Sequence, residues 1–302
     1  MSYSRHCREI LIFGSLAAII FLAGCVQQQT YTANDGLTIQ KFAPQLNRIG
    51  GNSDLIIIML IENTGESNAE KVNGELIGLD DWKITEVRTK TVPNIQGADP
   101  AHQLKGGQDV IAWKLTSPKN PFEQKYDFTG RLYFEYKTSV SVLYKVLSSN
   151  YYQTLSDEQK SKENPGISSI SVSSGPISVS VKTQETFANG GKIPIEFDIT
   201  NVGSGEAFTL VSLPDRYKPT RETSDQITNI RVSGVTNCGD DVVNPFGVLT
   251  TVRLSNGKQG KIVCYVDTAG IETSKVLPID MVLDYSYAVE KTSSITVSRS
   301  LG

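Results

Sequence analysis

Histidine and cysteine are scarce in this sequence, and this limits the chemistry that the chain can perform. The chain has 302 residues, of which two are histidines and four are cysteines. A Ser-His-Asp triad needs a histidine beside a nucleophile, and a zinc cage needs Cys and His ligands at close spacing. His6 lies near the N-terminus, His102 lies in a loop-like segment, and no Gly-x-Ser-x-Gly motif occurs. We therefore expect His102 to be a surface residue, and we expect no metal, no cofactor and no enzymatic activity.

The sequence also has no strong excess of charge. Its 29 basic and 32 acidic residues give a net charge of -3, and no basic run occurs. Nucleic-acid-binding domains carry a clustered positive charge. The composition therefore indicates that nucleic acid is not a partner.

Long apolar runs are missing except at the start of the chain. Residues 10–25 are uncharged and apolar and follow a short head with Arg5 and Arg8, which is typical of an export signal. The run ends in Leu-Ala-Gly-Cys, which resembles a prokaryotic lipobox. That resemblance implies cleavage after residue 24 and lipidation of Cys25, so that lipid would hold the chain on the cell membrane. The alternative is an uncleaved transmembrane anchor, although such a helix needs roughly 20 apolar residues. Both interpretations place the later residues outside the cytoplasm.

Short strands and turns, and not helices, dominate the rest of the sequence. Residues 54–63 are almost continuously apolar, as expected of a strand between two sheets, and residues 128–136 alternate with a period of two. Residues 137–139 suggest a closing hairpin. Ser156 and Gln159 have the spacing of a capping box at the start of a short helix. The expected organisation is a signal peptide over residues 1–24, a flexible tether over 25–36, a β-sandwich over 37–150, a linker with a short helix over 151–175 and a second β-sandwich over 176–302.

The two halves share a strand-and-turn pattern. Residues 192–201 alternate apolar and polar side chains and, like residues 54–63, end in Asn-x-Gly. Asparagine and glycine supply the turn conformations, including positive φ, that reverse a buried strand. An aromatic hairpin is expected at the end of each half, so we infer an internal duplication. The shared turn positions are Asn63, Gly65 and Ala69 in the first half and Asn201, Gly203 and Ala207 in the second.

This pattern resembles the CARDB-type domain, an immunoglobulin-like β-sandwich found in tandem on archaeal and bacterial surface proteins. The resemblance implies an all-β fold of two tandem immunoglobulin-like sandwiches and a role in display or adhesion. It implies no catalytic residue.

The two cysteines that follow Cys25 suggest a disulfide. Cys238 lies in a turn and Cys264 in a predicted strand, and disulfides persist outside the cytoplasm. The alternative is two buried thiols. A bridge of this loop length would stabilise the second domain by roughly 3 kcal/mol.

Three further sites have weaker patterns. The acidic pairs Asp80-Asp81 and Asp240-Asp241 offer oxygen ligands for calcium, but neither has the spacing of an EF-hand loop. Two carboxylates that converge in space would allow glycoside hydrolysis, but no pair stands out. An exposed aromatic platform would bind sugars, although Trp113 is expected in the core and the Tyr151-Tyr152 pair between the domains. The aromatic candidates are Trp82, Trp113, Tyr133, Tyr151 and Tyr152.

The sequence therefore predicts a lipid-anchored surface protein with a non-enzymatic adhesive, structural or accessory role. Its partner would be an extracellular protein or polysaccharide that the sequence does not identify. The alternatives are a lipoprotein that binds a carbohydrate or serves a transporter, and a hydrolase with carboxylate chemistry.

Overall fold

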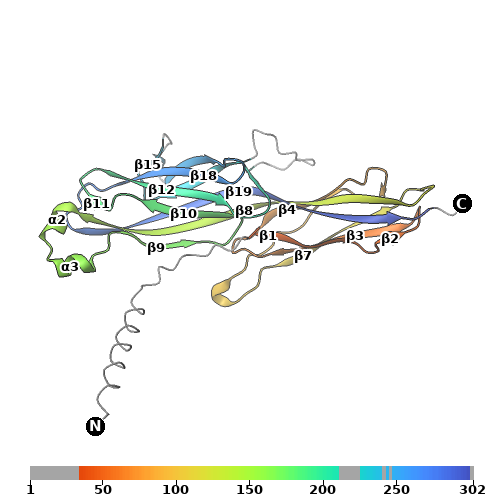
Figure 1. Ribbon diagram of the computed structural model, residues 1–302, viewed down its shortest axis with the longest axis horizontal. Helices are drawn as coiled ribbons and strands as arrows, with labels where there is room; N and C mark the ends of the chain where they lie inside the picture. The colour runs from red at the N-terminus through yellow and green to blue at the C-terminus, as the bar shows by residue number, and fades with distance from the viewer. Residues whose placement is uncertain (1–33, 211–224, 240–242, 245–246, 300–302) are drawn as a thin grey trace, which may run out of the picture. The chain divides into compact units, whose positions relative to one another are not determined.

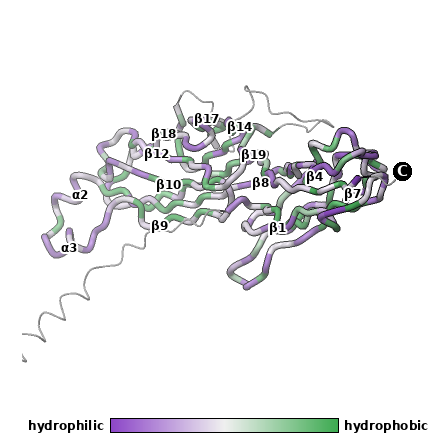
Figure 2. The backbone as a smooth tube through the Cα atoms, turned by 45° about the vertical axis from the view of Figure 1, so that its right-hand side comes forward, coloured by the Kyte–Doolittle hydropathy of each residue, from purple (hydrophilic) through white to green (hydrophobic). Residues whose placement is uncertain are grey.

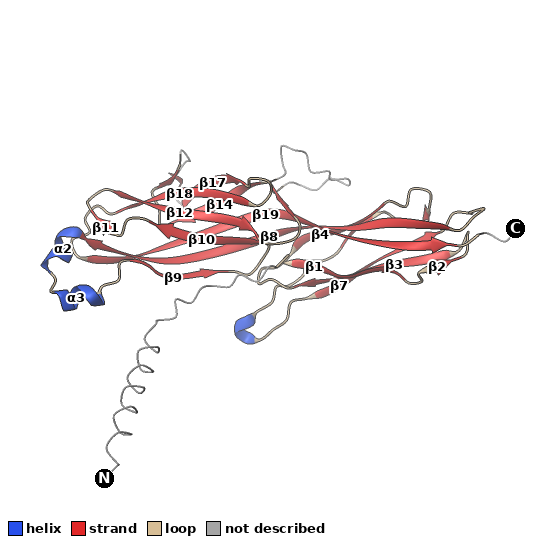
Figure 3. Ribbon diagram, in the orientation of Figure 1, coloured by secondary structure: helices blue, strands red, loops and turns tan. Residues whose placement is uncertain are grey.

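The computed structural model describes residues 34–210, 225–239, 243–244 and 247–299 (Figure 1). These residues form an almost entirely β-structure with two short α-helices and one 3-10 helix (Figure 3). Within these ranges, no helix has the length and apolar character needed to span a membrane. The elements are β1 Leu37–Pro44, β2 Arg48–Ile49, β3 Asp54–Asn63, β4 Glu70–Ile77, β5 Lys83–Ile84, β6 Thr89–Thr91, η2 Pro100–His102, β7 Gln108–Thr116, β8 Gln124–Ser148, α2 Ser149–Thr154, α3 Asp157–Lys162, β9 Gly166–Val172, β10 Ile177–Thr183, β11 Phe187–Ala188, β12 Lys192–Asn201, β13 Glu206–Phe208, β14 Gln226–Ser233, β15 Asn237–Cys238, β16 Val243–Asn244, β17 Gly247–Arg253, β18 Gln259–Asp267 and β19 Ser274–Val297.

The strands form three sheets. Two sheets have four strands each, in the orders β1-β3-β7-β5 and β10-β12-β18-β15. The third has eleven strands, of which seven follow the order β16-β17-β14-β19-β8-β4-β6. The other four lie off this path, where β9 and β11 pair with β8 and β2 and β13 pair with β19. One part of this large sheet packs against β1-β3-β7-β5, and we call that pair sandwich 1; another part packs against β10-β12-β18-β15, and we call that pair sandwich 2. The predicted all-β fold with immunoglobulin-like two-sheet packing is confirmed.

Large side chains from both sheets fill sandwich 1. The Phe42 ring on β1 meets the Phe128 ring on β8 edge to face, with their centroids 5.3 Å apart. Gly130 leaves room for this contact, because a Cβ there would lie 2.5 Å from Met59 and 2.7 Å from Phe42. Trp113 is fully buried, so the prediction that it lies in the core is confirmed.

In sandwich 2, hydroxyl groups on β8 bond across to β10. Thr138 donates to the carbonyl of Ile177 at 3.1 Å, and the Tyr144 hydroxyl lies 3.2 Å from that of Thr183. Apolar and polar residues alternate along the strands of this sandwich (Figure 2), so one set of side chains faces the core.

Two strands run through both sandwiches. Strands β8 and β19 have 25 and 24 residues and pair in antiparallel register over the whole of β19, from Ser274 opposite Leu147 to Val297 opposite Gln124. Strands usually have roughly 3–10 residues. The expected hairpin at residues 137–139 is therefore wrong, and so is its counterpart late in the second half.

The chemistry of these residues explains the difference. Residues 137–139 are Lys, Thr and Ser, and tight hairpins favour Gly, Asn or Asp at positions of positive φ. The extended backbone also has partners on both sides here. Ser139 exchanges hydrogen bonds with Ser173 on one side and pairs with Val282 of β19 on the other.

The long ladder interleaves the two sandwiches. The second half of β19 pairs with the first half of β8 and so completes sandwich 1, although it lies at the end of the chain. The contiguous ranges 37–150 and 176–302 therefore do not each contain a complete sandwich. Part of the expected linker is also a strand, because β9 pairs with β8 at residues 140–145.

The short helix predicted after residue 150 is confirmed in detail. Helix α3 begins with a capping box in which the Gln159 backbone donates to the Ser156 hydroxyl and the Ser156 backbone donates to the Gln159 side chain. It follows α2 at the end of β8. Tyr152 of α2 packs on Phe187 of sandwich 2 with ring centroids 5.0 Å apart, so its expected place between the domains is wrong.

Candidate functional site

The first Asn-x-Gly turn is held by a buried tyrosine from β8. Asn63 ends β3, is 1% exposed and donates through its amide to the carbonyls of Ser67 and Ile95 at 2.8 and 3.0 Å. The Tyr136 hydroxyl donates to the Asn63 amide oxygen at 3.4 Å and accepts a hydrogen bond from the Ser67 backbone at 3.2 Å. The strand end, the turn and the long ladder are therefore fixed to one another.

The second turn repeats this network with residues from the other half. Asn201 ends β12 and donates to the carbonyls of Gly205 and Gly257 at 3.0 and 3.1 Å. The Tyr287 hydroxyl donates to Asn201 at 2.9 Å and accepts from the Gly205 backbone at 3.0 Å. The sequence predicts a strand that includes Tyr136 and an aromatic hairpin at the end of each half, but it does not connect Tyr136 or Tyr287 to the turns. The available signal was a tyrosine in the late aromatic segment of each half.

The two repeat glycines are needed for close packing and not for positive φ. Neither Gly65 nor Gly203 has a positive φ, which corrects that part of the sequence argument. A Cβ at Gly65 would lie 2.1 Å from the Tyr136 hydroxyl, and one at Gly203 would lie 2.3 Å from the Tyr287 hydroxyl. Ala69 and Ala207 are buried just beyond these turns, as expected for small residues at a strand start.

Residues 34–36 connect the two turns. Asn34 donates to the Thr64 carbonyl and to the Ser174 hydroxyl, both at 2.9 Å. The Asp35 carboxylate accepts hydrogen bonds from the backbone and the hydroxyl of Ser204. The chain therefore enters sandwich 1 beside the place where the two sandwiches meet, and we call this place the junction.

Burial keeps the junction tyrosines protonated. It raises the pKa of Tyr136 and Tyr287 well above the ordinary value for tyrosine, and it does the same to Tyr285, which pairs with Tyr136 across the ladder and lies 2.9 Å from the Thr138 hydroxyl. Protonated phenols can donate the hydrogen bonds described above. Their role is to hold the fold together.

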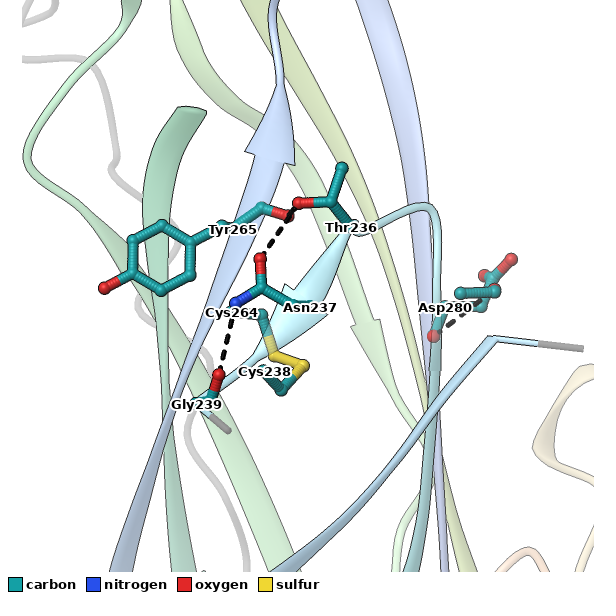
Figure 4. The surroundings of a disulfide bond; sticks show 8 residues. Thr236, Asn237, Cys238, Gly239, Cys264, Tyr265 and Asp280 are labelled. Carbon is teal, nitrogen blue, oxygen red and sulfur yellow. Dashed lines mark hydrogen bonds between the residues drawn. A yellow bond between two sulfur atoms is a disulfide. The ribbon is translucent and has the colours of Figure 1, made fainter. Parts of the chain in front are cut away.

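Cys238 and Cys264 form the predicted disulfide (Figure 4). They lie directly opposite each other in the antiparallel pair of β15 and β18, and both are fully buried. Thr236 donates to the Tyr265 carbonyl at 2.9 Å beside the bridge. The alternative of two buried thiols is wrong.

Among the residues singled out for catalysis or metal binding, those that the structure describes do not assemble into a site. The His102 side chain is 75% exposed and its Nδ1 lies 2.7 Å from the Asp99 carboxylate, so its predicted place on the surface is confirmed. Asp80 pairs with Arg88 at 3.1 Å. Among the residues that the structure describes, no three His, Cys, Asp or Glu side chains gather as a metal site would need. Asp240, Asp241 and Cys25 lie outside the described residues.

Three of the five aromatic candidates cannot form an exposed platform. Trp82, Trp113 and Tyr133 are all at most 4% exposed, so they offer no stacking face for a sugar.

A hollow at the junction has four carboxylates in its lining. It has a volume of about 440 Å³ and contains Glu66, Glu70, Glu135 and Asp284 among its lining residues. Lys71 pairs with Glu135 and Arg231 pairs with Asp284, each at 2.8 Å, and Glu66 accepts a hydrogen bond from the Ser174 backbone. Three of the four carboxylates therefore take part in contacts of the junction itself.

Comparisons with known proteins identify no family for this chain. Neither a protein-family model nor a curated protein matches it. Among solved structures, it is similar to the CupB6 tip adhesin from Pseudomonas aeruginosa, with 9% identity, 89% of this chain and 99% of that chain covered, and a TM-score of 0.17. It is also similar to a type II cohesin dyad from the adaptor ScaA scaffoldin of Acetivibrio cellulolyticus, with 8% identity, 83% of this chain and 86% of the cohesin chain covered, and a TM-score of 0.17. The chitinase ChiA74 from Bacillus thuringiensis has 8% identity, with 79% of this chain and 28% of that chain covered, and a TM-score of 0.16. At these scores the likenesses carry no argument about function.

Proposed function

We propose that the protein is a membrane-anchored surface lipoprotein that acts as a non-enzymatic adhesive or structural module. Its anchor would be lipid on Cys25, and its two sandwiches would stand outside the cytoplasm. The CARDB-type resemblance belongs to the same proposal.

One observation carries the structural part of the proposal. The β8-β19 ladder runs through both sandwiches, and the buried Tyr136 and Tyr287 side chains tie one Asn-x-Gly turn of each sandwich to it. A continuous ladder of this kind suits a stiff module that carries mechanical load between a membrane anchor and a binding partner. The buried disulfide supports an extracytoplasmic location, because such bridges persist in oxidising compartments.

No second function is favoured by a specific observation. A sugar-binding face would need exposed rings, whereas the tryptophans are buried. A carboxylate hydrolase would need two carboxylates that are available to a substrate. Three of the four junction carboxylates instead form ion pairs or hydrogen bonds with neighbouring residues.

Mass spectrometry of the protein extracted from native membranes without reduction tests the proposal. The proposal predicts a mature N-terminus at a lipidated Cys25, together with a peptide crosslinked between Cys238 and Cys264. Protease added to intact cells should remove the sandwiches, and Cys25→Ser should abolish lipidation of the protein. An intact segment 1–24, or full protection from the protease, would contradict the proposal.

A further inference from the structure

Strand β3 is apolar on both of its faces. Leu55, Ile57, Met59 and Ile61 point into sandwich 1, whereas Ile56, Ile58 and Leu60 alternate with them and are only partly buried. Sheets that face water on one side normally present polar residues there. The outer face of β3 therefore departs from the usual pattern.

The matching strand of sandwich 2 shows what a solvent-facing version contains. Both β3 and β12 have ten residues and end at the repeat asparagine, so position 58 matches 196 and position 60 matches 198. Sandwich 2 has Glu196 and Asp198 there, and these pair with Lys261 and Lys182. Sandwich 1 has isoleucine and leucine at the same positions.

Small side chains flank the apolar row. Ile58 lies between Ala43 on β1 and Ala112 on β7, and Leu60 lies between Lys41 and Val110, of which the valine is 52% exposed. Branched side chains form a ridge, and the smaller alanine side chains beside it leave lower positions. A similar ridge on another sheet can pack into such positions. We call Ala43, Ile56, Ile58, Leu60, Val110 and Ala112 the β3 stripe.

Lysines cover backbone carbonyls on β1, which is an edge strand of the same sheet, and on β7, which the short edge strand β5 covers only at residues 115–116. The Lys291 ammonium donates to the carbonyls of Ile39 and Gln40 on β1, and Lys90 donates to the Ala112 carbonyl on β7. Lysines at an edge block the addition of another strand. A partner would therefore meet the face of the sheet and not its edge.

Charge around the stripe favours a second copy over a lipid surface. Asp54 and Glu62 lie at the two ends of β3, while Lys114 and Lys41 flank it on opposite neighbouring strands. Mixed charge gives no attraction to anionic lipid, whereas a two-fold partner brings the lysines of one copy near the carboxylates of the other. At one end of the stripe, Gln45, Ile56, Thr85 and Lys114 line a hollow of about 350 Å³ that can receive a partner's side chain.

We propose that the β3 stripe is a self-association face through which two copies of this chain pack sheet to sheet. This inference rests on the proposed function, because lipid anchoring would hold the copies at high local concentration. From strand and residue spacings the stripe covers about 300 Å², and about 500 Å² with its polar rim. A stable interface buries about 800 Å² on each partner, so the contact is weak in solution and depends on many anchored copies.

The test uses the mature lipoprotein, labelled with donor or acceptor dyes and inserted in neutral lipid vesicles at increasing surface density. We expect energy transfer that rises with density, and the double variant Ile58→Glu, Leu60→Asp should weaken association at least ten-fold. That variant installs the residues that β12 carries at the same positions, so the fold should tolerate it, and circular dichroism checks this. Phe122→Ser is the matched control, since Phe122 is 78% exposed and lies on a loop outside the stripe.

Four results would overturn the inference: no energy transfer at any density, retention of association by a folded double variant, equal loss in the Phe122 control, or binding to bare vesicles of an unlipidated chain that begins at Val26. The last result would assign the stripe to lipid. Flotation measures insertion separately, so protein that fails to float contradicts the proposed function, and protein that floats without associating contradicts only this inference.

Discussion

Replacing Gly65 by alanine tests the turn network directly. The new Cβ would lie 2.1 Å from the Tyr136 hydroxyl and 2.8 Å from the Ser174 carbonyl, so one of these groups must move. Overpacking of this kind costs about 1–3 kcal/mol, and we expect the upper part of that range because the hydroxyl is bonded to two partners. Tyr136→Phe alone leaves the Ser67 backbone donor without its acceptor and should cost about 1–3 kcal/mol.

The double variant distinguishes this explanation from general fragility. Tyr136→Phe removes the hydroxyl oxygen that the Cβ of Ala at position 65 would contact. The loss of unfolding free energy in the double variant should therefore be at least about 1 kcal/mol smaller than the sum of the losses in the two single variants. Urea unfolding followed by fluorescence measures all three variants. Gly191→Ala is the matched control, since its Cβ would meet nothing within 4 Å, and it should change stability by less than about 0.5 kcal/mol. Strict additivity of the two single changes would refute the reasoning.

Three further predictions follow from the ladder, the bridge and the buried phenols. A chain that ends at residue 285 loses the half of β19 that completes sandwich 1, so it should be recovered unfolded or aggregated, and a soluble folded product would contradict the interleaved topology. Changing Cys238 and Cys264 together to alanine opens a bridge across 26 residues and should lower the free energy of unfolding by about 3 kcal/mol, whereas an unchanged denaturation midpoint would show that the bridge does not limit the unfolded chain. Because burial raises the pKa of Tyr136, Tyr285 and Tyr287 in the folded state, the unfolded chain loses these protons first. Stability should therefore be fully present below about pH 10 and fall as the pH rises beyond it. Tyrosinate absorbance that develops for all tyrosines before unfolding would count against this result.

Local patterns predicted much of the fold. The apolar run that became β3 and the alternating run that became β12 were visible with the bounds that the structure has. The capping box at Ser156 and the disulfide were also predicted from short-range chemistry. These features depend on residues that lie close together in sequence or on a single available pair.

Long-range pairing was not predictable in the same way. A segment such as Lys137-Thr138-Ser139 is compatible with a loop or a strand, and its partner, Val282 to Asp284, lies far along the chain. The same limit hid the roles of Tyr136 and Tyr287, because each hydroxyl reaches an asparagine more than 70 residues away. The outward side of β3 was visible as apolar sequence, but only the sheet order showed that nothing in the described structure buries it fully.

Hydrogen exchange at the junction tests the central structural claim most directly, namely that one continuous ladder joins the two sandwiches. The measurement follows the backbone amides of residues 136–139 and 284–287 by mass spectrometry. The structure predicts that they exchange as slowly as the strand residues on either side, because the pairing of β8 and β19 has no break there. Exchange that is a hundred-fold or more faster at these positions, with slow exchange on both sides, would mean two separate sandwiches joined by a hinge and would contradict the claim.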